Sequence, residues 1–379
     1  SEVMLNWLFK TPPPASTPRT AIGLMSGTSL DGLDACVVKE TGHGNRVEVV
    51  STLSTAFPPL VRDGFKRMIE TGHANIQELL TLEHQYTEVV AQQCQQLIKA
   101  TDESISLIGF HGQTLWHTPD LGSTLQIGFA EYLAETTGIP VAHQFRRSDM
   151  ARGGQGAPLA PLFHQLHFER ETENVAVLNL GGIANISLLV PGQPLSGWDI
   201  GPANTLSDGW HHRSQNQAFD RNGAHAASGS VHQNLLDQLL KDPYFTQRPP
   251  KSTGREYFSQ SWLQQTLDQL APISAADVQA TLNQLTATLV HQALPEEVDI
   301  LVVCGGGVHN THLMDALDDT VDPLVVTSDA FAIDPDFVEA ACFGWLGLQC
   351  VDSHPLATTL ITGSAAPGVL GSIIHPTKG

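Results

Sequence analysis

The stretch Gly23-Leu24-Met25-Ser26-Gly27-Thr28-Ser29-Leu30-Asp31-Gly32-Leu33-Asp34 is the most informative part of this 379-residue chain. It is a turn rich in Gly, Ser and Thr between two runs of strand-forming residues. Such a turn gathers backbone N–H groups and hydroxyls in a small space, and glycine lacks the Cβ that would keep a ligand at a distance. A plain hairpin is the commoner meaning of such residues. The density of the run nevertheless favours a phosphate-binding loop.

Two carboxylates, Asp31 and Asp34, close this loop. They would repel bare phosphate, but they suit a Mg²⁺ ion that carries phosphate, because this cation prefers carboxylate, water and phosphate oxygens. The chain has no Gly-Lys pair of a Walker A loop and no His-Arg-Asp motif of a protein kinase. The loop therefore indicates a binding site for phosphate with Mg²⁺ in a protein that is neither a Walker A NTPase nor a protein kinase.

The chain falls into two halves that begin alike. Short β-type runs separated by tight turns predict an antiparallel meander in each half, over 20–25, 33–39 and 46–55 and again over 174–180, 186–190 and 197–200. Helices and strands alternate after each meander, among them helices over 59–70 and 75–99, a strand over 106–110 and a helix over 336–347. The repetition predicts an α/β fold with an internal duplication.

We predict a domain boundary near residues 145–162, where Gly and Pro interrupt the pattern. The first domain then covers 20–150 together with part of the C-terminal segment 350–379, and the second covers 151–349. Residues 1–19, which include three consecutive prolines, are expected to be a flexible leader.

The composition narrows the possible partners. Asp and Glu number 39 against 19 Lys and Arg, and the formal net charge of −20 argues against binding to DNA, RNA or an anionic membrane. No uninterrupted apolar run is long enough to span a bilayer. The five cysteines form no Cys-x-x-Cys motif, which favours a reducing compartment. We expect a soluble, cytoplasmic protein with no nucleic-acid or membrane partner.

Two further glycine turns follow predicted strands in the second half, at Gly181-Gly182 and at Gly305-Gly306. Each of them alone is most simply a tight turn. A Gly-rich turn between a strand and a helix is also a common nucleotide contact, because it presents backbone N–H groups to phosphate. Turns that face each other across a cleft would supply donors to a triphosphate from several sides.

Asp199 stands near the end of a predicted strand, where it would deliver a carboxylate into a cleft. A carboxylate in reach of water or of a sugar hydroxyl can act as a general base. A turn-forming Asp is an equally good interpretation. Asn204, five residues later, is expected to cap the following helix.

Four more residues are candidates for substrate binding. Arg146 and Arg147 form a local basic cluster that could bind a carboxylate or phosphate, or could instead pair with Asp149 between the domains. His111 follows a strand and could reach a substrate, although a structural histidine is the simpler interpretation. Glu339 is an ionisable residue in an apolar helix, and it is either a ligand of a sugar hydroxyl or a solvated residue.

These motifs together resemble the anhydro-N-acetylmuramic acid kinases. The similarity runs in order from residue 20 to the C-terminus, through segments 25–34, 109–114, 145–151, 153–159, 179–185, 199–204 and 304–310. The resemblance implies an actin/hexokinase-like fold, in which two duplicated ribonuclease H-like domains enclose an ATP cleft. It also implies a homodimer. The family opens the 1,6-anhydro ring of its sugar with water and phosphorylates O6, which yields N-acetylmuramate 6-phosphate in peptidoglycan recycling.

The resemblance also implies roles for individual residues. Asp199 matches the general base that activates the attacking water. Asp31 would hold Mg²⁺ through water, and His111, Glu339 and one of the arginines Arg146 and Arg147 would contact the sugar. The implied ATP-binding residues are Gly27, Thr28, Ser29, Leu30, Asp31, Gly32, Leu33, Asp34, Gly181, Gly182, Gly305 and Gly306.

Two other interpretations stay open on the sequence. A kinase for another anhydrosugar or a hexose would share the nucleotide loops and differ around Arg146 and Glu339. A nucleotide-driven binding protein would use ATP hydrolysis to gate a partner, and it would hydrolyse ATP slowly without any sugar. A metal hydrolase is a distant third interpretation, since the histidines form no coherent ligand spacing.

Overall fold

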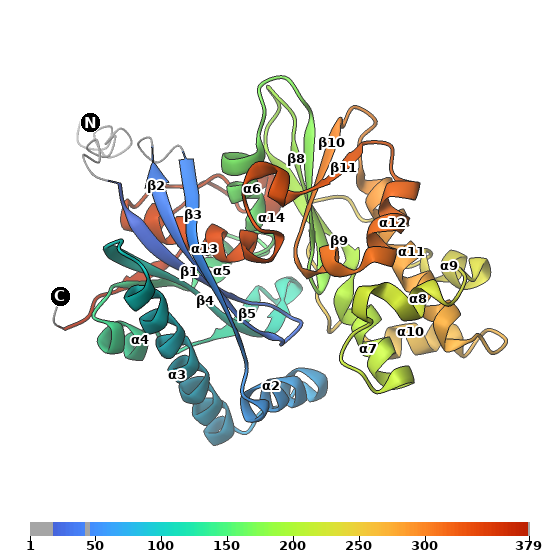
Figure 1. Ribbon diagram of the computed structural model, residues 1–379, viewed down its shortest axis with the longest axis horizontal. Helices are drawn as coiled ribbons and strands as arrows, with labels where there is room; N and C mark the ends of the chain where they lie inside the picture. The colour runs from blue at the N-terminus through green and yellow to red at the C-terminus, as the bar shows by residue number, and fades with distance from the viewer. Residues whose placement is uncertain (1–17, 42–45, 378–379) are drawn as a thin grey trace.

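The computed structural model describes residues 18–41 and 46–377. The predicted leader therefore lies outside the described residues, apart from Pro18 and Arg19. The described chain forms two β-sheets that lie side by side, each covered by helices on its outer face (Figure 1). None of the described helices is both long and apolar enough to cross a membrane.

The first sheet has the strand order β12-β6-β4-β1-β2-β3, with β5 paired to β4. Strands β1, β2 and β3 form an antiparallel meander, and β4 and β6 continue the sheet in parallel with β1. Its strands are β1 (Thr20–Ser26), β2 (Gly32–Thr41), β3 (Arg46–Ala56), β4 (Ile105–Thr118), β5 (Ser123–Ile127), β6 (Val141–His143) and β12 (Ser372–Ile374).

The second sheet repeats this arrangement in the order β11-β10-β7-β8-β9. Strands β7, β8 and β9 are antiparallel neighbours, and β10 and β11 follow in parallel with β7. Its strands are β7 (Val175–Leu180), β8 (Ile183–Leu189), β9 (Ser196–Pro202), β10 (Ile300–Cys304) and β11 (Leu324–Thr327). The order β3-β2-β1-β4-β6 thus matches β9-β8-β7-β10-β11, and the predicted fold of two duplicated α/β domains is confirmed.

Helices form three layers around the two sheets (Figure 1). The outer layer of the first sheet contains α2 (Pro59–Thr71), α3 (Ile76–Ala100) and α4 (Ala130–Thr137). The outer layer of the second contains α7 (Asn204–Gln215), α8 (Ala224–Ala227), α9 (Gln233–Leu239), α10 (Gln260–Leu267), α11 (Ala275–Ala293) and α12 (Thr311–Thr320). Helices α6 (Ala160–Phe168) and α13 (Val338–Val351) lie between the sheets, and the short helices α5 (Phe145–Met150) and α14 (Thr359–Thr362) contribute residues to the same core.

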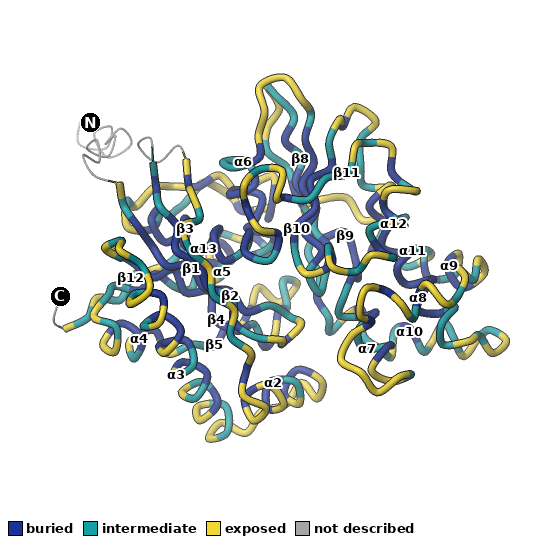
Figure 2. The backbone as a smooth tube through the Cα atoms, viewed as in Figure 1, coloured by how far each residue is buried: buried dark blue, intermediate teal, exposed yellow. Residues whose placement is uncertain are grey.

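A continuous apolar core joins the two sheets through α6 and α13. Cys36 of the first sheet and Val177 of the second belong to the same buried cluster as Phe163 of α6 and Phe343 of α13. Strands β1 and β7 and helix α13 are buried along nearly their whole length, whereas the edge strand β3 is largely exposed (Figure 2). The two domains are therefore joined by packing as well as by the chain.

Helix α13 packs on β1 and β4 of the first sheet, although its residues fall in the predicted second domain. The approach is so close that a Cβ on Gly23 would collide with the carbonyl oxygen of Ala340. Strand β12 then pairs with β6 and extends the same sheet. The C-terminal segment therefore rejoins the first sheet before residue 350, at α13. The missing side chain of Gly23 permits this close packing of α13 on β1.

Strand β4 is much longer than the predicted strand over 106–110, and it forms a hairpin with β5 that the sequence pattern did not indicate. The added half of β4 carries buried polar residues, including Gln113 and His117. These side chains lie beside the cleft or at its wall, so the apolar alternation typical of a strand is lost there.

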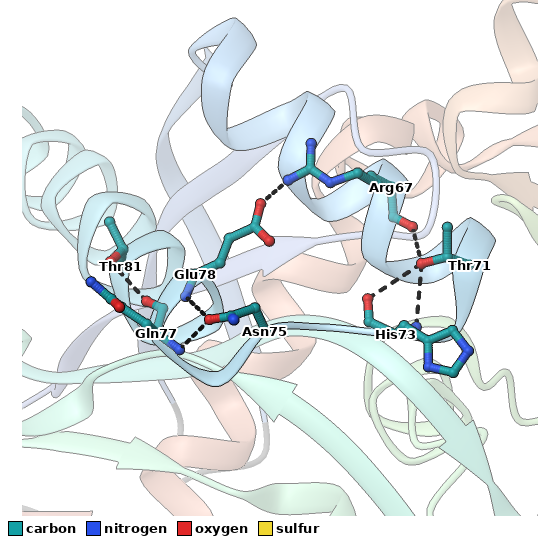
Figure 3. A network of polar contacts seen from close by, with 7 residues as sticks. All are labelled: Arg67, Thr71, His73, Asn75, Gln77, Glu78 and Thr81. Atoms are coloured by element: carbon teal, nitrogen blue, oxygen red, sulfur yellow. Dashed lines mark hydrogen bonds and ion pairs between the residues drawn. The ribbon is translucent and has the colours of Figure 1, made fainter.

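Helices α2 and α3 are joined by a compact polar turn (Figure 3). Asn75 caps α3 by accepting hydrogen bonds from the backbone N–H groups of Gln77 and Glu78. An ion pair between Arg67 and Glu78 connects the two helices directly. This turn fixes α3 at the position that the helical pattern predicted.

Candidate functional site

A cleft of about 750 Å³ opens between the two domains. The loop after β1 lines it from the first domain, and the turns at Gly181-Gly182 and Gly305-Gly306 line it from the second. The three glycine-rich turns, which the family resemblance places in one ATP site, therefore line the same cleft. Leu30 is the exception in the loop, because its side chain is buried in the core below α2 and α3 and does not line the cleft.

The two facing turns approach each other closely at Gly182. A Cβ at this position would collide with the hydroxyl groups of both Thr28, in the first domain, and Thr205, in the second. The two hydroxyls lie 3.5 Å apart. Only glycine leaves the space that this contact needs, so the second glycine turn is part of the interdomain contact and is more than a hairpin.

Asp199 projects into the cleft from β9. The strand extends to Pro202, so Asp199 lies within it and not near its end as predicted. Its side chain is only 6% exposed, and Oδ2 accepts a hydrogen bond of 3.0 Å from the backbone N–H of Thr253. Burial raises the pKa of Asp199 to about 7, against the opposing effects of the Thr253 hydrogen bond and the charge of Arg146. A carboxyl poised near neutral pH can exchange protons with a bound water.

Asn204 does not cap helix α7, contrary to the prediction. The helix begins at Asn204 itself, after Ala203, and no side chain caps it. Its amide Nδ2 instead donates to the carbonyl oxygen of Leu180, and its backbone N–H donates to that of Gly181. Asn204 thus ties the start of α7 to the second glycine turn, because the tertiary contact with that turn replaces local capping.

Arg146 lies in the cleft next to His111. Its Nε donates to Nε2 of the histidine at 2.9 Å, and its Nη1 donates to the carbonyl oxygen of Gly156 at 3.0 Å. Nδ1 of His111 lies 2.6 Å from the carbonyl oxygen of Gly112, so it carries the proton. Burial and the charge of Arg146 lower the pKa of His111 to about 3, which keeps it neutral. The neutral imidazole orients a guanidinium whose other N–H groups are available to an anion.

Arg147 is exposed and does not line the cleft, so the structure separates the two arginines. Asp149, the alternative partner of this cluster, forms no ion pair in residues 18–41 and 46–377. It is fully buried and accepts hydrogen bonds from the hydroxyls of Thr358 and Thr362 and from the N–H of Gly156. Asp149 therefore joins the segment at Gly156, near the predicted domain boundary, to α14. The predicted alternative of a salt bridge with Asp149 is wrong.

Glu339 lines the cleft from the first turn of α13. Burial raises the pKa of its carboxyl, while the charge of Arg146 lowers it. Glu339 and Asp199 both act on the pKa of Arg146, so one guanidinium is shared electrostatically by two carboxyls. The arrangement offers a cation and two acceptors to one ligand.

The acidic end of the cleft contains Asp31 and Asp208 from opposite domains. Burial raises the pKa of Asp208 to about 8, and the charge of Asp31 adds to the effect. Asp31 remains accessible to solvent, although surrounding protein atoms raise the pKa of its carboxyl. Asp34 is partly engaged, because it accepts a hydrogen bond from the hydroxyl of Ser54. Carboxylates gathered beside the loop after β1 supply the oxygen ligands that Mg²⁺ prefers.

The family model of anhydro-N-acetylmuramic acid kinase matches residues 19–376. The chain belongs to the anhydro-N-acetylmuramic acid kinase family. The resemblance stated from the sequence motifs is thereby confirmed.

Several relatives in this kinase family cover almost the whole chain. The anhydro-N-acetylmuramic acid kinase of Pseudomonas fluorescens (strain Pf0-1) is 42% identical over 359 residues, which is 93% of this chain and 98% of the relative. That of Pasteurella multocida (strain Pm70) is 41% identical over 368 residues, 94% of this chain and 97% of the relative. Component A of the (R)-2-hydroxyglutaryl-CoA dehydratase of Acidaminococcus fermentans is a far more distant solved structure, with a TM-score of 0.44 and 10% identity over 87% of this chain and 98% of that one.

One part of the site in this family member escaped the sequence analysis. The segment Lys251–Glu256, which we call the bridging segment, passes between the domains and contributes Thr253, Gly254 and Glu256 to the cleft. Asp208 was missed as well, because it lies inside an amphipathic helix and looks like a solvated residue. The signal that could have found the bridging segment is its pair of basic residues, Lys251 and Arg255, in a strongly acidic chain.

Proposed function

We propose that the protein is an ATP-dependent kinase that opens the 1,6-anhydro ring of anhydro-N-acetylmuramic acid with water and phosphorylates O6. The product is N-acetylmuramate 6-phosphate, and the reaction belongs to peptidoglycan recycling. The observation that carries the proposal is the position of Asp199, a buried carboxyl that shares one cleft with the glycine-rich loop after β1. Membership of the kinase family supports the same substrate.

Asp199 supplies the base in this reaction. Its carboxylate takes a proton from water while the water oxygen forms a bond to the anomeric carbon and the bond from that carbon to O6 breaks. O6, with its electron pair, then takes the γ-phosphoryl group, and ADP leaves. A pKa raised to about 7 suits this role, because a general base works best when its pKa lies near the working pH.

The substrate side of the cleft is formed by Arg146, His111 and Glu339. The guanidinium of Arg146 binds the carboxylate of the muramic acid, since two parallel N–H bonds match a carboxylate better than an ammonium does. His111 holds the guanidinium in place through the 2.9 Å bond to Nε. Glu339 accepts a hydrogen bond from a sugar hydroxyl at the wall of the cleft.

The nucleotide side is formed by the loop Gly27–Asp34 and the two glycine turns of the second domain. Their backbone N–H groups surround the phosphates from both sides of the cleft. Asp31, through water, and Asp208 opposite it would hold Mg²⁺ at this end of the cleft. The ion would supply charge neutralisation at the phosphates, which assists phosphoryl transfer. We assign nucleotide contacts to the loop except for Leu30, whose side chain lies in the core.

We further propose that the protein works as a homodimer in the cytoplasm. The family resemblance supports the dimer, and light scattering after size exclusion should give twice the mass of the chain. All five cysteines are free and buried, which suits a reducing compartment. Cell fractionation with an antibody against the protein tests the location.

Mass spectrometry of the reaction products tests the proposed function. The protein is mixed with ATP, Mg²⁺ and anhydro-N-acetylmuramic acid in water enriched in oxygen-18. The product should gain one phosphate and one labelled water. Phosphate gain without water would indicate an ordinary sugar kinase, and ATP hydrolysis unaffected by the sugar would indicate a nucleotide-driven binding protein.

A further inference from the structure

Arg255 reaches from the second domain into the loop after β1. Its Nη1 donates a hydrogen bond of 2.6 Å to the carbonyl oxygen of Thr28. Glu70, near the end of α2, and the adjacent Glu256 both provide negative charge around the guanidinium. A charged donor that is largely withdrawn from water forms a stronger hydrogen bond than a neutral one, so this is a substantial link across the cleft.

The hydrogen bond from Arg255 sets the orientation of one peptide group in the loop. Thr28 and Ser29 both line the cleft. A peptide bond is planar and trans, so a carbonyl of Thr28 turned toward Arg255 directs the N–H of Ser29 the opposite way. Arg255 therefore controls the direction of a donor in the proposed phosphate-binding loop without touching the ligand itself.

The bridging segment also binds the carboxyl of Asp199, through Thr253, which lies two residues before Arg255. Thr253 donates its backbone N–H to Oδ2 of Asp199 at 3.0 Å, and the backbone N–H of Asp199 donates to the carbonyl oxygen of Lys251 at 3.3 Å. Ser252 donates to Oε1 of Gln155 at 2.7 Å, which anchors the start of the bridging segment. The loop and the base are thus connected by three residues of backbone.

We propose that Arg255 is a positioning residue that couples the phosphate-binding loop to Asp199, so that nucleotide and sugar bind cooperatively. The inference rests on the proposed function, because it takes the loop as the nucleotide site and Asp199 as a group of the sugar site. A ligand that orders the loop also orders the bridging segment through Arg255, and the second ligand then meets a site already in place. The coupling is reciprocal, so each ligand tightens the other by the same factor.

Calorimetric titration measures this coupling directly. The intact protein is titrated with a non-hydrolysable ATP analogue and Mg²⁺, with and without saturating anhydro-N-acetylmuramic acid. The sugar should tighten the analogue by roughly tenfold in the unaltered protein, a typical allosteric factor. In Arg255→Gln the factor should fall to about one, since the shorter, neutral amide does not replace the link to Thr28. Arg248→Gln is the matched control: Arg248 is exposed, lies seven residues earlier and should keep the full factor.

The outcomes separate this inference from the proposed function. An unchanged factor in a folded Arg255→Gln protein that still phosphorylates the sugar overturns the role of Arg255 alone. If the unaltered protein neither binds nor phosphorylates the sugar, both this proposal and the proposed function are overturned. Circular dichroism establishes that the variants are folded. Should Arg255→Gln not fold, Arg255→Lys decides: its single ammonium reaches less far, so a factor below that of the unaltered protein is expected, and an equal factor rejects the proposal.

Discussion

The backbone N–H of Thr253 donates a hydrogen bond of 3.0 Å to Oδ2 of Asp199. The two residues lie 54 positions apart in the chain, and the contact turns one oxygen of the carboxyl toward the bridging segment. The other oxygen, Oδ1, takes no protein donor within residues 18–41 and 46–377. In the proposed reaction Oδ1 is the oxygen that would accept the proton of the attacking water, and the bond from Thr253 would fix its orientation.

Replacing Asp199 with Asn should abolish turnover while nucleotide binding survives. The amide oxygen can still accept from Thr253, but the neutral side chain takes no proton from water. We expect the rate to fall by about 10²–10⁴-fold, the usual contribution of a general base. Steady-state kinetics and nucleotide titration check the two parts. Full activity in the variant would remove Asp199 from the mechanism.

The activity should rise with pH up to neutrality. An ordinary aspartate is ionised above about pH 4, whereas burial raises the pKa of Asp199 to about 7. The carboxylate is the active form of a base, so kcat/KM should increase roughly tenfold per pH unit below about pH 6.5 and level off above about pH 7.5. A profile that is flat between pH 5 and 8 would contradict the assignment.

The same shift has the opposite effect on stability. The pKa of Asp199 is higher in the folded protein than in the unfolded chain, so the folded state binds the proton more tightly. Ionisation therefore costs stability, which is lost progressively as the pH rises from about 4 through about 7. Asp199→Asn avoids this cost and should unfold at higher urea concentration than the unaltered protein at pH 8. The difference should vanish near pH 4.

Arg146→Lys should weaken sugar binding, whereas Arg147→Lys should not. Lysine loses the fork that contacts His111, Gly156 and, in our proposal, the substrate carboxylate. Losing a charged hydrogen bond of about 1.5–3 kcal/mol corresponds to a KM for the sugar that is roughly 10–100-fold higher. Arg147 is exposed outside the cleft and supplies the matched control. Equal KM values for the two variants would reject Arg146 as the carboxylate ligand.

Asp149→Ala should destabilise the fold. The substitution removes the acceptor that Gly156, Thr358 and Thr362 share, and the buried N–H of Gly156 is left without one. The two threonine hydroxyls keep contacts with Ser364 and with the carbonyl oxygen of Thr358. We expect the free energy of unfolding to fall by about 1–3 kcal/mol, the cost of an unsatisfied buried group. Urea denaturation measures the loss. Asp322→Ala, at an exposed position, should change stability by less than about 0.5 kcal/mol.

The duplicated fold and most of its elements were predictable from local patterns. Helix α3 follows its apolar periodicity and its Asn75 cap, and both meanders follow their alternation and tight turns. The hairpin of β4 and β5 was not predictable, since a strand that places polar side chains beside a cleft carries no apolar alternation. The glycine turns were recognisable in the sequence, and the family resemblance placed them in one cleft, but the contact between Thr28 and Thr205 at Gly182 was not predictable.

The sequence by itself determined the family, the duplicated α/β fold and the residue types that phosphate and sugar chemistry require, because these depend on local spacing and on motifs. Only the tertiary structure decided which groups meet. In the structure Arg146 lines the cleft and Arg147 does not. Asn204 binds the second glycine turn and does not cap a helix, and Arg255 contacts Thr28. The reason is physical: burial, pKa and contact between residues 54 or 227 positions apart arise from packing, which no local pattern encodes.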